Sequence, residues 1–269
     1  MRYALKVQYI GKNYLGSQIQ FEGKTEIGPT IQGELEKALS TLINSIRSNA
    51  KPELQAQKGA SGAPNNRRFK TVFSGRTDKG VNSFGQVIHF DTDKYIVASK
   101  FVHQLNEILP DDISVSDLKI VDAGFHAQKS AKRRHYRFEF INRRYKNAFD
   151  GDLMRVKFNV NTDRMQKALN YLLGEHDFSS FKSSGTLNPS TVCFIEKAQV
   201  ERQGDKVIIN IVGNRFLYNM VRTIVGTLLE IEGHNLEPEH MLKVLEAKDR
   251  RKAGQTVIPY GLTLMKVEY

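Results

Sequence analysis

The order of the predicted strands and helices constrains the fold of this chain more than any other feature. Residues 3–9 alternate apolar and polar side chains, which predicts a strand. Thr30 is expected to cap the helix that follows, because its hydroxyl can accept from a backbone N–H of the first turn. Ser99 is expected to cap a second helix, which Pro110 ends. Further strands are predicted at 69–73, 86–91 and about 113–120. The order is β-α-β-β-α-β, typical of ferredoxin-like domains.

The second half of the chain repeats this order. Strands are predicted at 135–141, about 153–160, 194–202, 206–213 and 262–269. Helices are predicted after Asn161 or Thr162, from about 214 to 232, and from Pro238 onward. We therefore expect an α+β protein of two ferredoxin-like domains, residues 1–122 and 123–269. Their strands would form a mixed or antiparallel sheet with helices on one face and a basic cleft between the domains.

Residues 46–68 interrupt the first half without any periodicity, and they are rich in Ala, Gly, Asn, Gln and Lys. This composition predicts an insertion that is a solvated linker for most of its length. Its basic end, which includes Arg67 and Arg68, lies beside the predicted strand at 69–73. A contact between this basic end and RNA is the alternative interpretation.

The charge of the chain favours a polyanionic partner. Among 269 residues, 40 Lys and Arg stand against 29 Asp and Glu, which leaves a net charge of +11. Such an excess gains affinity for phosphates by counterion release. The single cysteine, Cys193, excludes an internal disulfide and suits a reducing, cytoplasmic setting. The sequence has no signal-peptide pattern, no membrane-spanning apolar stretch and no Cys/His spacing typical of a metal site.

The stretch FSGRTDKGV, residues 73–81, joins two predicted strands and carries the most specific chemistry. It presents Arg76 and Asp78 on a loop between Gly75 and Gly80. Glycine lets a ligand approach the main chain, and loops held by a sheet often carry binding and catalytic groups. Taken alone, Asp-x-Gly is more often turn chemistry, with Arg76 pairing to Asp78.

SGRTDKGVNSFGQVIHFD resembles the active-site segment of the tRNA pseudouridine synthase A family, and five further segments match that family in the same order. These segments are LNEILPDDI, FHAQKSAKRRHYRFEF, LLGEHDFSSF, GNRFLYNMVRTIVGTLLE and AGQTVIPYGLTLMKVEY. The chain departs from the family at Ile10, where Asp is usual, at Ser17, where Trp is usual, and at Cys193, where a basic residue is common. Residues 46–70 and 184–194 match poorly.

The resemblance implies an enzyme that converts uridine to pseudouridine in the anticodon stem and loop of tRNA, acting as a homodimer. No cofactor is needed, since the reaction is an isomerisation. Asp78 would be the catalytic carboxylate, either as a nucleophile on the sugar or as a general base. Arg222 would pair with Asp78 and keep it ionised. Tyr136 would stack on the target base and help remove its C5 proton.

Without the resemblance, Arg222 and Tyr136 each have a simpler structural interpretation. Arg222 could be a solvent-facing helix arginine, although it lies in line with Asn219 and with Gly226, which would permit close approach of another backbone or side chain. Tyr136 could be a core aromatic in register with Phe138; both interpretations hold if its ring is packed and its hydroxyl faces the cleft.

Five cations are candidates for RNA binding. Arg76 would hold the strand open while the target base is flipped. The others belong to the densest basic stretch, where alternating positions could line one wall of a groove: Lys132, Arg133, Arg134 and Arg137. Two competing hypotheses remain: a non-catalytic RNA-binding or RNA-folding protein, since RRM-like domains share this architecture, and a related synthase that acts on another RNA.

Overall fold

The computed structural model describes residues 1–23, 25–46, 69–185 and 190–269, so most of the predicted insertion lies outside the described residues. Ten strands of the described chain form one sheet. They are β1 (Arg2–Tyr9), β4 (Val72–Phe73), β5 (Asn82–Asp91), β6 (Ile113–Val121), β7 (Arg133–Asn142), β8 (Arg155–Val156), β9 (Gly174–Asp177), β10 (Val192–Gln203), β11 (Lys206–Gly213) and β12 (Leu262–Glu268). A separate hairpin pairs β2 (Phe21–Glu22) with β3 (Thr25–Glu26).

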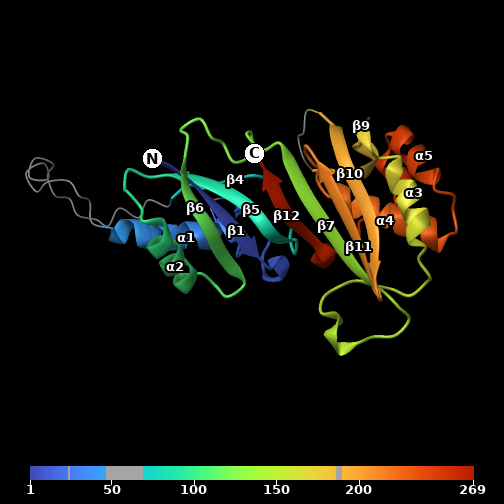
Figure 1. Ribbon diagram of the computed structural model, residues 1–269, viewed down its shortest axis with the longest axis horizontal. Helices are drawn as coiled ribbons and strands as arrows, with labels where there is room; N and C mark the ends of the chain where they lie inside the picture. The colour runs from blue at the N-terminus through green and yellow to red at the C-terminus, as the bar shows by residue number, and fades with distance from the viewer. Residues whose placement is uncertain (24, 47–68, 186–189) are drawn as a thin grey trace, which may run out of the picture.

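Strand β12 lies in the middle of this sheet and joins its two halves. The main path runs β6-β1-β5-β12-β7-β11-β10-β9, with β4 beside β5 and β8 beside β7. β12 is parallel to β5, through Thr263 opposite Asn82 and Leu264 opposite Ser83, and antiparallel to β7. Figure 1 shows it between β5 and β7. The predicted α+β class with a mixed sheet is confirmed.

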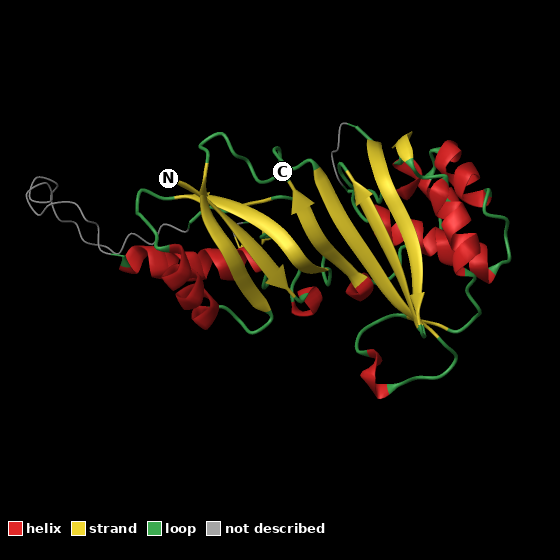
Figure 2. Ribbon diagram, viewed as in Figure 1, coloured by secondary structure: helices red, strands yellow, loops and turns green. Residues whose placement is uncertain are grey.

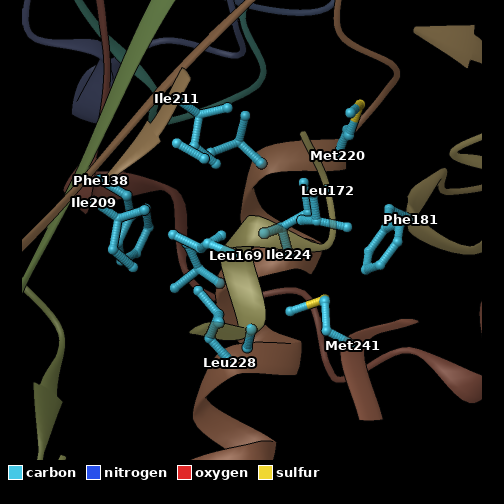
Figure 3. Packing of buried hydrophobic residues seen from close by; sticks show 14 of the residues in the cluster. Phe138, Leu169, Leu172, Phe181, Ile209, Ile211, Met220, Ile224, Leu228 and Met241 are labelled. Atoms are coloured by element: carbon cyan, nitrogen blue, oxygen red, sulfur yellow. The ribbon is translucent and has the colours of Figure 1, made fainter. Parts of the chain in front are cut away.

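Five α-helices of the described chain cover the sheet in two groups (Figure 2). They are α1 (Ile31–Ser45), α2 (Ala98–Ile108), α3 (Thr162–Asn170), α4 (Met220–Gly233) and α5 (His240–Ala247). Side chains from α1 and α2 form one apolar cluster with β1 and β5, including the buried Leu5, Leu35 and Ile88. Side chains from α3, α4 and α5 form a second cluster with β7 and β11, shown in Figure 3.

Both helix groups lie on the same face of the sheet. Tyr9 belongs to the first apolar cluster and is opposite Ser83. Ser83 is opposite Leu264, which in turn is opposite Tyr136, and Tyr136 packs against the second cluster. Because paired residues in a ladder share a face, this row runs along the helical side of the sheet. The row therefore connects the first apolar cluster to the second across β12.

Several predicted element boundaries require correction. Thr30 caps α1 as predicted, accepting from the Gly33 N–H at 3.1 Å. Ser99 does not cap α2, which begins at Ala98 after Val97 without a side-chain cap. The helix predicted from residue 214 begins only at Met220, because Asn219 has a left-handed backbone (φ 61°).

Two further expectations were too long or misplaced by a turn. The extra strand expected at 153–160 reduces to the two residues of β8. Pro238 lies in a turn before α5 rather than in its first turn, and its carbonyl accepts from the Met241 N–H at 3.1 Å. In the part of the chain that the structure describes, no helix is both long and apolar enough to cross a membrane.

Candidate active site

The loop of residues 74–81 is held rigidly between β4 and β5. The Gln86 side chain donates to the Gly75 carbonyl at 2.9 Å and accepts from the Ser74 hydroxyl at 2.5 Å. Gly80 has a φ of +81°, and a Cβ there would meet the ring of Pro259 at 2.7 Å. Only glycine combines that backbone angle with so close a neighbour. The loop is therefore fixed by Gln86 of β5 and by Pro259, which lies in the segment that leads into β12.

The first loop of the chain fixes Thr77, the residue before Asp78. Ser17 is fully buried; its N–H donates to the Thr77 carbonyl at 3.0 Å, and its hydroxyl accepts from the Thr77 N–H at 2.8 Å. The Tyr9 hydroxyl bonds the Thr77 hydroxyl at 2.7 Å. Ser17 is one of the positions where the chain departs from the family pattern, and sequence reasoning did not link it to the Asp78 loop.

Asp78 and Arg222 meet across the junction of the two halves, as the family resemblance implied. An Arg222 guanidinium nitrogen lies 3.8 Å from an Asp78 carboxylate oxygen, with 15% and 24% of the two side chains exposed. The Arg222 guanidinium also donates to the Val257 carbonyl at 2.8 Å and to the Asn219 side chain at 2.7 Å. Asn219 in turn donates to the Ser183 hydroxyl at 3.0 Å. Arg222 is thus aimed by neighbours on both sides.

Sequence reasoning placed Asn219 in line with Arg222 but missed its contact. The signal was available: the two residues are three apart, which brings side chains together along a helix, and asparagine tolerates the left-handed backbone that starts α4. The prediction for Gly226 is confirmed. A Cβ at that position would lie 1.7 Å from the Gln255 carbonyl oxygen. This close approach holds the 254–257 segment, and with it the Val257 carbonyl, against α4.

Burial and the opposite charge act against each other on this pair. Burial raises the pKa of Asp78 above its usual range, and the charge of Arg222 offsets part of that rise. Burial likewise lowers the pKa of Arg222, against the effect of Asp78. Sequence reasoning foresaw the stabilising effect of Arg222 on the carboxylate but not that burial would outweigh it.

Tyr136 faces the helical side of β7, towards the same junction. Its ring packs edge-on against Phe216, with centroids 5.0 Å apart, and against the second apolar cluster. Burial raises the pKa of the Tyr136 hydroxyl, and the nearby Tyr9 and Asp78 raise it further. Packing of the ring in the core and an approach of the hydroxyl to Asp78 are therefore compatible. The structure brings Asp78, Tyr136 and Arg222 into one region.

The basic stretch does not line a single wall, because successive strand residues point to opposite faces. Arg134 shares the helical side with Tyr136, while Arg133 and Arg137 point to the other face. On that face Arg133 pairs with Glu196 and Glu268. Arg137 donates to the Asn210 side chain at 3.1 Å.

Arg134 donates to four backbone carbonyls: those of Ser74, Gln128, Ala131 and Asn214. This geometry favours a role in tying the Asp78 loop to β7 over a phosphate contact. Lys132 and Arg76 are exposed. Arg76 forms no ion pair with the described residues, so the predicted alternative of a salt bridge to Asp78 is not observed. RNA binding by these five cations stays a prediction.

No three His, Cys, Asp or Glu side chains within the described ranges gather closely enough to hold a metal ion.

Comparison with known proteins identifies the family. The family described as tRNA pseudouridine synthase matches residues 168–269. The tRNA pseudouridine synthase A of Colwellia psychrerythraea is 37% identical over 100% of this chain and 94% of that protein. The protein of the same name from Bacillus subtilis is 37% identical over 100% of this chain and 99% of its own length, and that from Anoxybacillus flavithermus is 39% identical over 98% and 96%.

This chain is therefore an isomerase of the pseudouridine synthase class. Within that class it belongs to the tRNA pseudouridine synthase A family. Both the predicted family and the predicted type of enzyme are confirmed. A solved chain titled as part of a Cbf5-Nop10-Gar1 complex has a TM-score of 0.37 at 10% identity, over 85% of this chain and 44% of that one, which is too distant to support an argument.

Proposed function

We propose that this protein isomerises uridine to pseudouridine in tRNA, with Asp78 as the catalytic carboxylate. The observation that carries the proposal is the half-buried Asp78, on a braced loop, 3.8 Å from an Arg222 that other groups hold in place. Family membership supplies the reaction. The anticodon stem and loop are the proposed target region, on the strength of the resemblance.

The reaction breaks the bond between uracil N1 and ribose C1′ and forms a bond between uracil C5 and the same carbon. N1 gains a proton and C5 loses one, so the atoms balance without a cofactor. Asp78 either attacks the sugar as a nucleophile or removes a sugar proton as a base, and both roles require its ionised form. Arg222 stabilises that form by its charge.

Tyr136 is proposed to stack on the target base rather than to act as the base that takes the C5 proton. Its hydroxyl has a raised pKa, so it is a neutral phenol at neutral pH. Taking the C5 proton would first require a phenolate, which burial and the charge of Asp78 both disfavour. The ring, packed edge-on against Phe216, is already fixed in orientation for stacking.

Two broader features remain part of this proposal. When the short strands β2, β3, β8 and β9 and helix α5 are left out, the order β1-α1-β4-β5-α2-β6 recurs as β7-α3-β10-β11-α4-β12. This repeat supports two ferredoxin-like halves with the site and its cleft between them. A homodimer is proposed from the resemblance, and a cytoplasmic location from the single cysteine. Sedimentation velocity measures the first, and fractionation of cells the second.

The deciding experiment measures tritium release from unmodified tRNA with tritium at uracil C5. We expect release by the wild-type protein without added cofactor, and a fall of at least about 1,000-fold for Asp78→Asn, because a neutral amide cannot serve as nucleophile or base. The affinity of Asp78→Asn for tRNA should stay close to that of wild type.

Retained turnover in Asp78→Asn would exclude Asp78 as the catalytic group. Tight tRNA binding by the wild type without any release would favour a non-catalytic RNA-binding protein or a different RNA substrate.

A further inference from the structure

A projecting arm, residues 143–154, connects β7 to β8 and extends away from the body of the molecule (Figures 1 and 2). It carries two of the most exposed aromatic side chains in the described chain, Tyr145 at 75% and Phe149 at 96%. Large apolar side chains that stay in water cost solubility and often mark a binding surface. The catalytic proposal makes no use of them.

The backbone of the arm that carries these rings is held in place. Arg143 pairs with Asp150 across the arm and with Asp205 of the neighbouring turn at 3.1 Å, and it donates to the Tyr145 carbonyl at 2.9 Å. Asn147 accepts from the Phe149 N–H at 2.9 Å, as part of a capping box that starts a short 3₁₀ turn. An exposed aromatic on a preorganised turn loses little further entropy when it binds.

The arm also reaches the same end of the sheet as the Asp78 loop. Asp152 pairs with Lys12 of the first loop at 2.7 Å. The neighbouring Gly11 donates to the Asn82 side chain at 2.9 Å, and a Cβ on Gly11 would lie 2.1 Å from the Val81 carbonyl oxygen. The arm is thus linked through the first loop to Val81, the last residue of the Asp78 loop, and to Asn82, which follows it.

Charge indicates the kind of partner. Arg144 and Lys146 flank Tyr145 and are exposed, and neither side chain pairs with the described residues. Two cations beside two aromatic rings suit RNA, because bases stack on aromatic faces while phosphates meet the cations. Contact with a second copy of this chain is the competing outcome, and the test below distinguishes it.

We propose that the projecting arm binds the RNA substrate next to the target uridine. Tyr145 and Phe149 stack on unpaired bases, and Arg144 and Lys146 contact phosphates. This inference rests on the proposed function, because it takes the substrate to be RNA with unpaired bases close to the reacting uridine.

The test compares full-length variants by their Kd for an unmodified tRNA transcript and their KM in the tritium-release assay. The double variant Tyr145→Ala, Phe149→Ala should raise the Kd at least about 10-fold, with a parallel rise in KM, given the usual contribution of base stacking. The double variant Tyr145→Phe, Phe149→Tyr keeps both rings and should bind within about twofold of wild type. In the double variant Arg144→Ala, Lys146→Ala, the slope of log Kd against log salt concentration should fall by about 1 to 2.

Tyr95→Ala is the matched control. Tyr95 is 67% exposed and lies beyond the far end of β5 from the Asp78 loop, a strand about 30 Å long. It should bind tRNA like wild type. All of these side chains are exposed, so thermal unfolding should be unchanged and a lost affinity cannot be attributed to misfolding.

An unchanged Kd and KM in the alanine double variant would overturn the inference. So would a loss of affinity that accompanies a smaller oligomer in sedimentation velocity, since that result makes the arm a contact between copies. Failure of the wild type to release tritium would refute the proposed function instead, and the direct Kd comparison would still decide whether the arm binds RNA.

Discussion

At the residue scale, the candidate site places the Asp78 carboxylate where water is partly excluded and where one cation of the described chain, Arg222, compensates its charge. Burial raises the pKa of Asp78, and Arg222 lowers it again at a distance of 3.8 Å. Arg222 is not free to turn fully towards Asp78, because Asn219 and Val257 hold two of its donors. Such an arrangement leaves Asp78 incompletely satisfied before a substrate arrives, which is favourable for a reactive group.

The effect of Arg222 can be read from the pH dependence of single-turnover rates. In Arg222→Gln the pKa of Asp78 should rise further, because the opposite charge is lost while burial stays. Since the reaction requires the carboxylate, the acid limb of the rate profile should move to higher pH.

Arg222→Lys keeps the positive charge and serves as the control, with an acid limb close to that of wild type. An acid limb that does not move in Arg222→Gln would show that the two side chains do not interact in the enzyme–substrate complex.

At the scale of elements, the loop after β1 and the loop of residues 74–81 are far apart in sequence but form one rigid unit. The bonds of Ser17 join the two loops, so a substitution at Ser17 tests this unit most directly. Ser17→Ala leaves the buried Thr77 N–H without its acceptor, so we expect a loss of about 1–3 kcal/mol in the free energy of unfolding. The rate of the chemical step should fall as well, because Thr77 precedes Asp78.

Denaturant unfolding and single-turnover assays measure these two effects. Ser99→Ala is the control: Ser99 is exposed and does not cap α2, so stability should change by less than about 0.5 kcal/mol. Equal stability of the two variants would mean that the bond between the loops contributes nothing.

The contact of α4 with the segment at 254–257 decides whether Gly226→Ala raises or lowers the stability of the protein. Helix propensity alone favours Gly226→Ala by about 1 kcal/mol. The Cβ would overlap the Gln255 carbonyl, however, with 1.7 Å between the atoms. Overpacking should win and destabilise the protein by about 1–3 kcal/mol or more, and turnover should fall because the Val257 carbonyl that holds Arg222 is displaced.

Gly233→Ala lies in the same helix but meets the Phe158 ring at an ordinary 3.4 Å. It should leave stability unchanged or slightly raised in the same unfolding assay. A Gly226→Ala variant as stable as Gly233→Ala would show that the two segments separate at no cost.

The elements also show what local patterns can and cannot predict. Alternation correctly predicted β1 and β7, because each strand presents a row of apolar side chains to a core. The start of α4 was missed because the apolar Phe216 and Leu217 continue the helical spacing, while the break comes from the backbone of Asn219. Because the basic stretch was predicted to be a strand, its side chains had to alternate between two faces. Which of these faces meets the helices depends on how β7 pairs with its neighbouring strands, and local sequence does not show that pairing.

At the scale of the whole molecule, the sequence predicted the α+β class and the mixed sheet but not how β12 joins the two parts of that sheet. Nothing local to residues 262–268 shows that β12 inserts between β5 and β7. The meeting of Asp78 and Arg222 was predicted only from the resemblance. The position of β12 and the Asp78–Arg222 pair both depend on contacts between distant parts of the chain. The candidate residues could therefore be predicted from the sequence, but their geometry could not.

The central position of β12 has a consequence for how the molecule folds. Ser83 and Leu264, which meet in this joint, are 181 residues apart in sequence. Contacts of such long range form late, and domains fold from the N-terminal side during synthesis. Until β12 arrives, the start of β5 and residues 133–138 of β7 each keep one unpaired strand edge, which is a template for aggregation. We expect the nascent chain to need protection by chaperones during this interval, and catalytic competence to be the last property that it acquires.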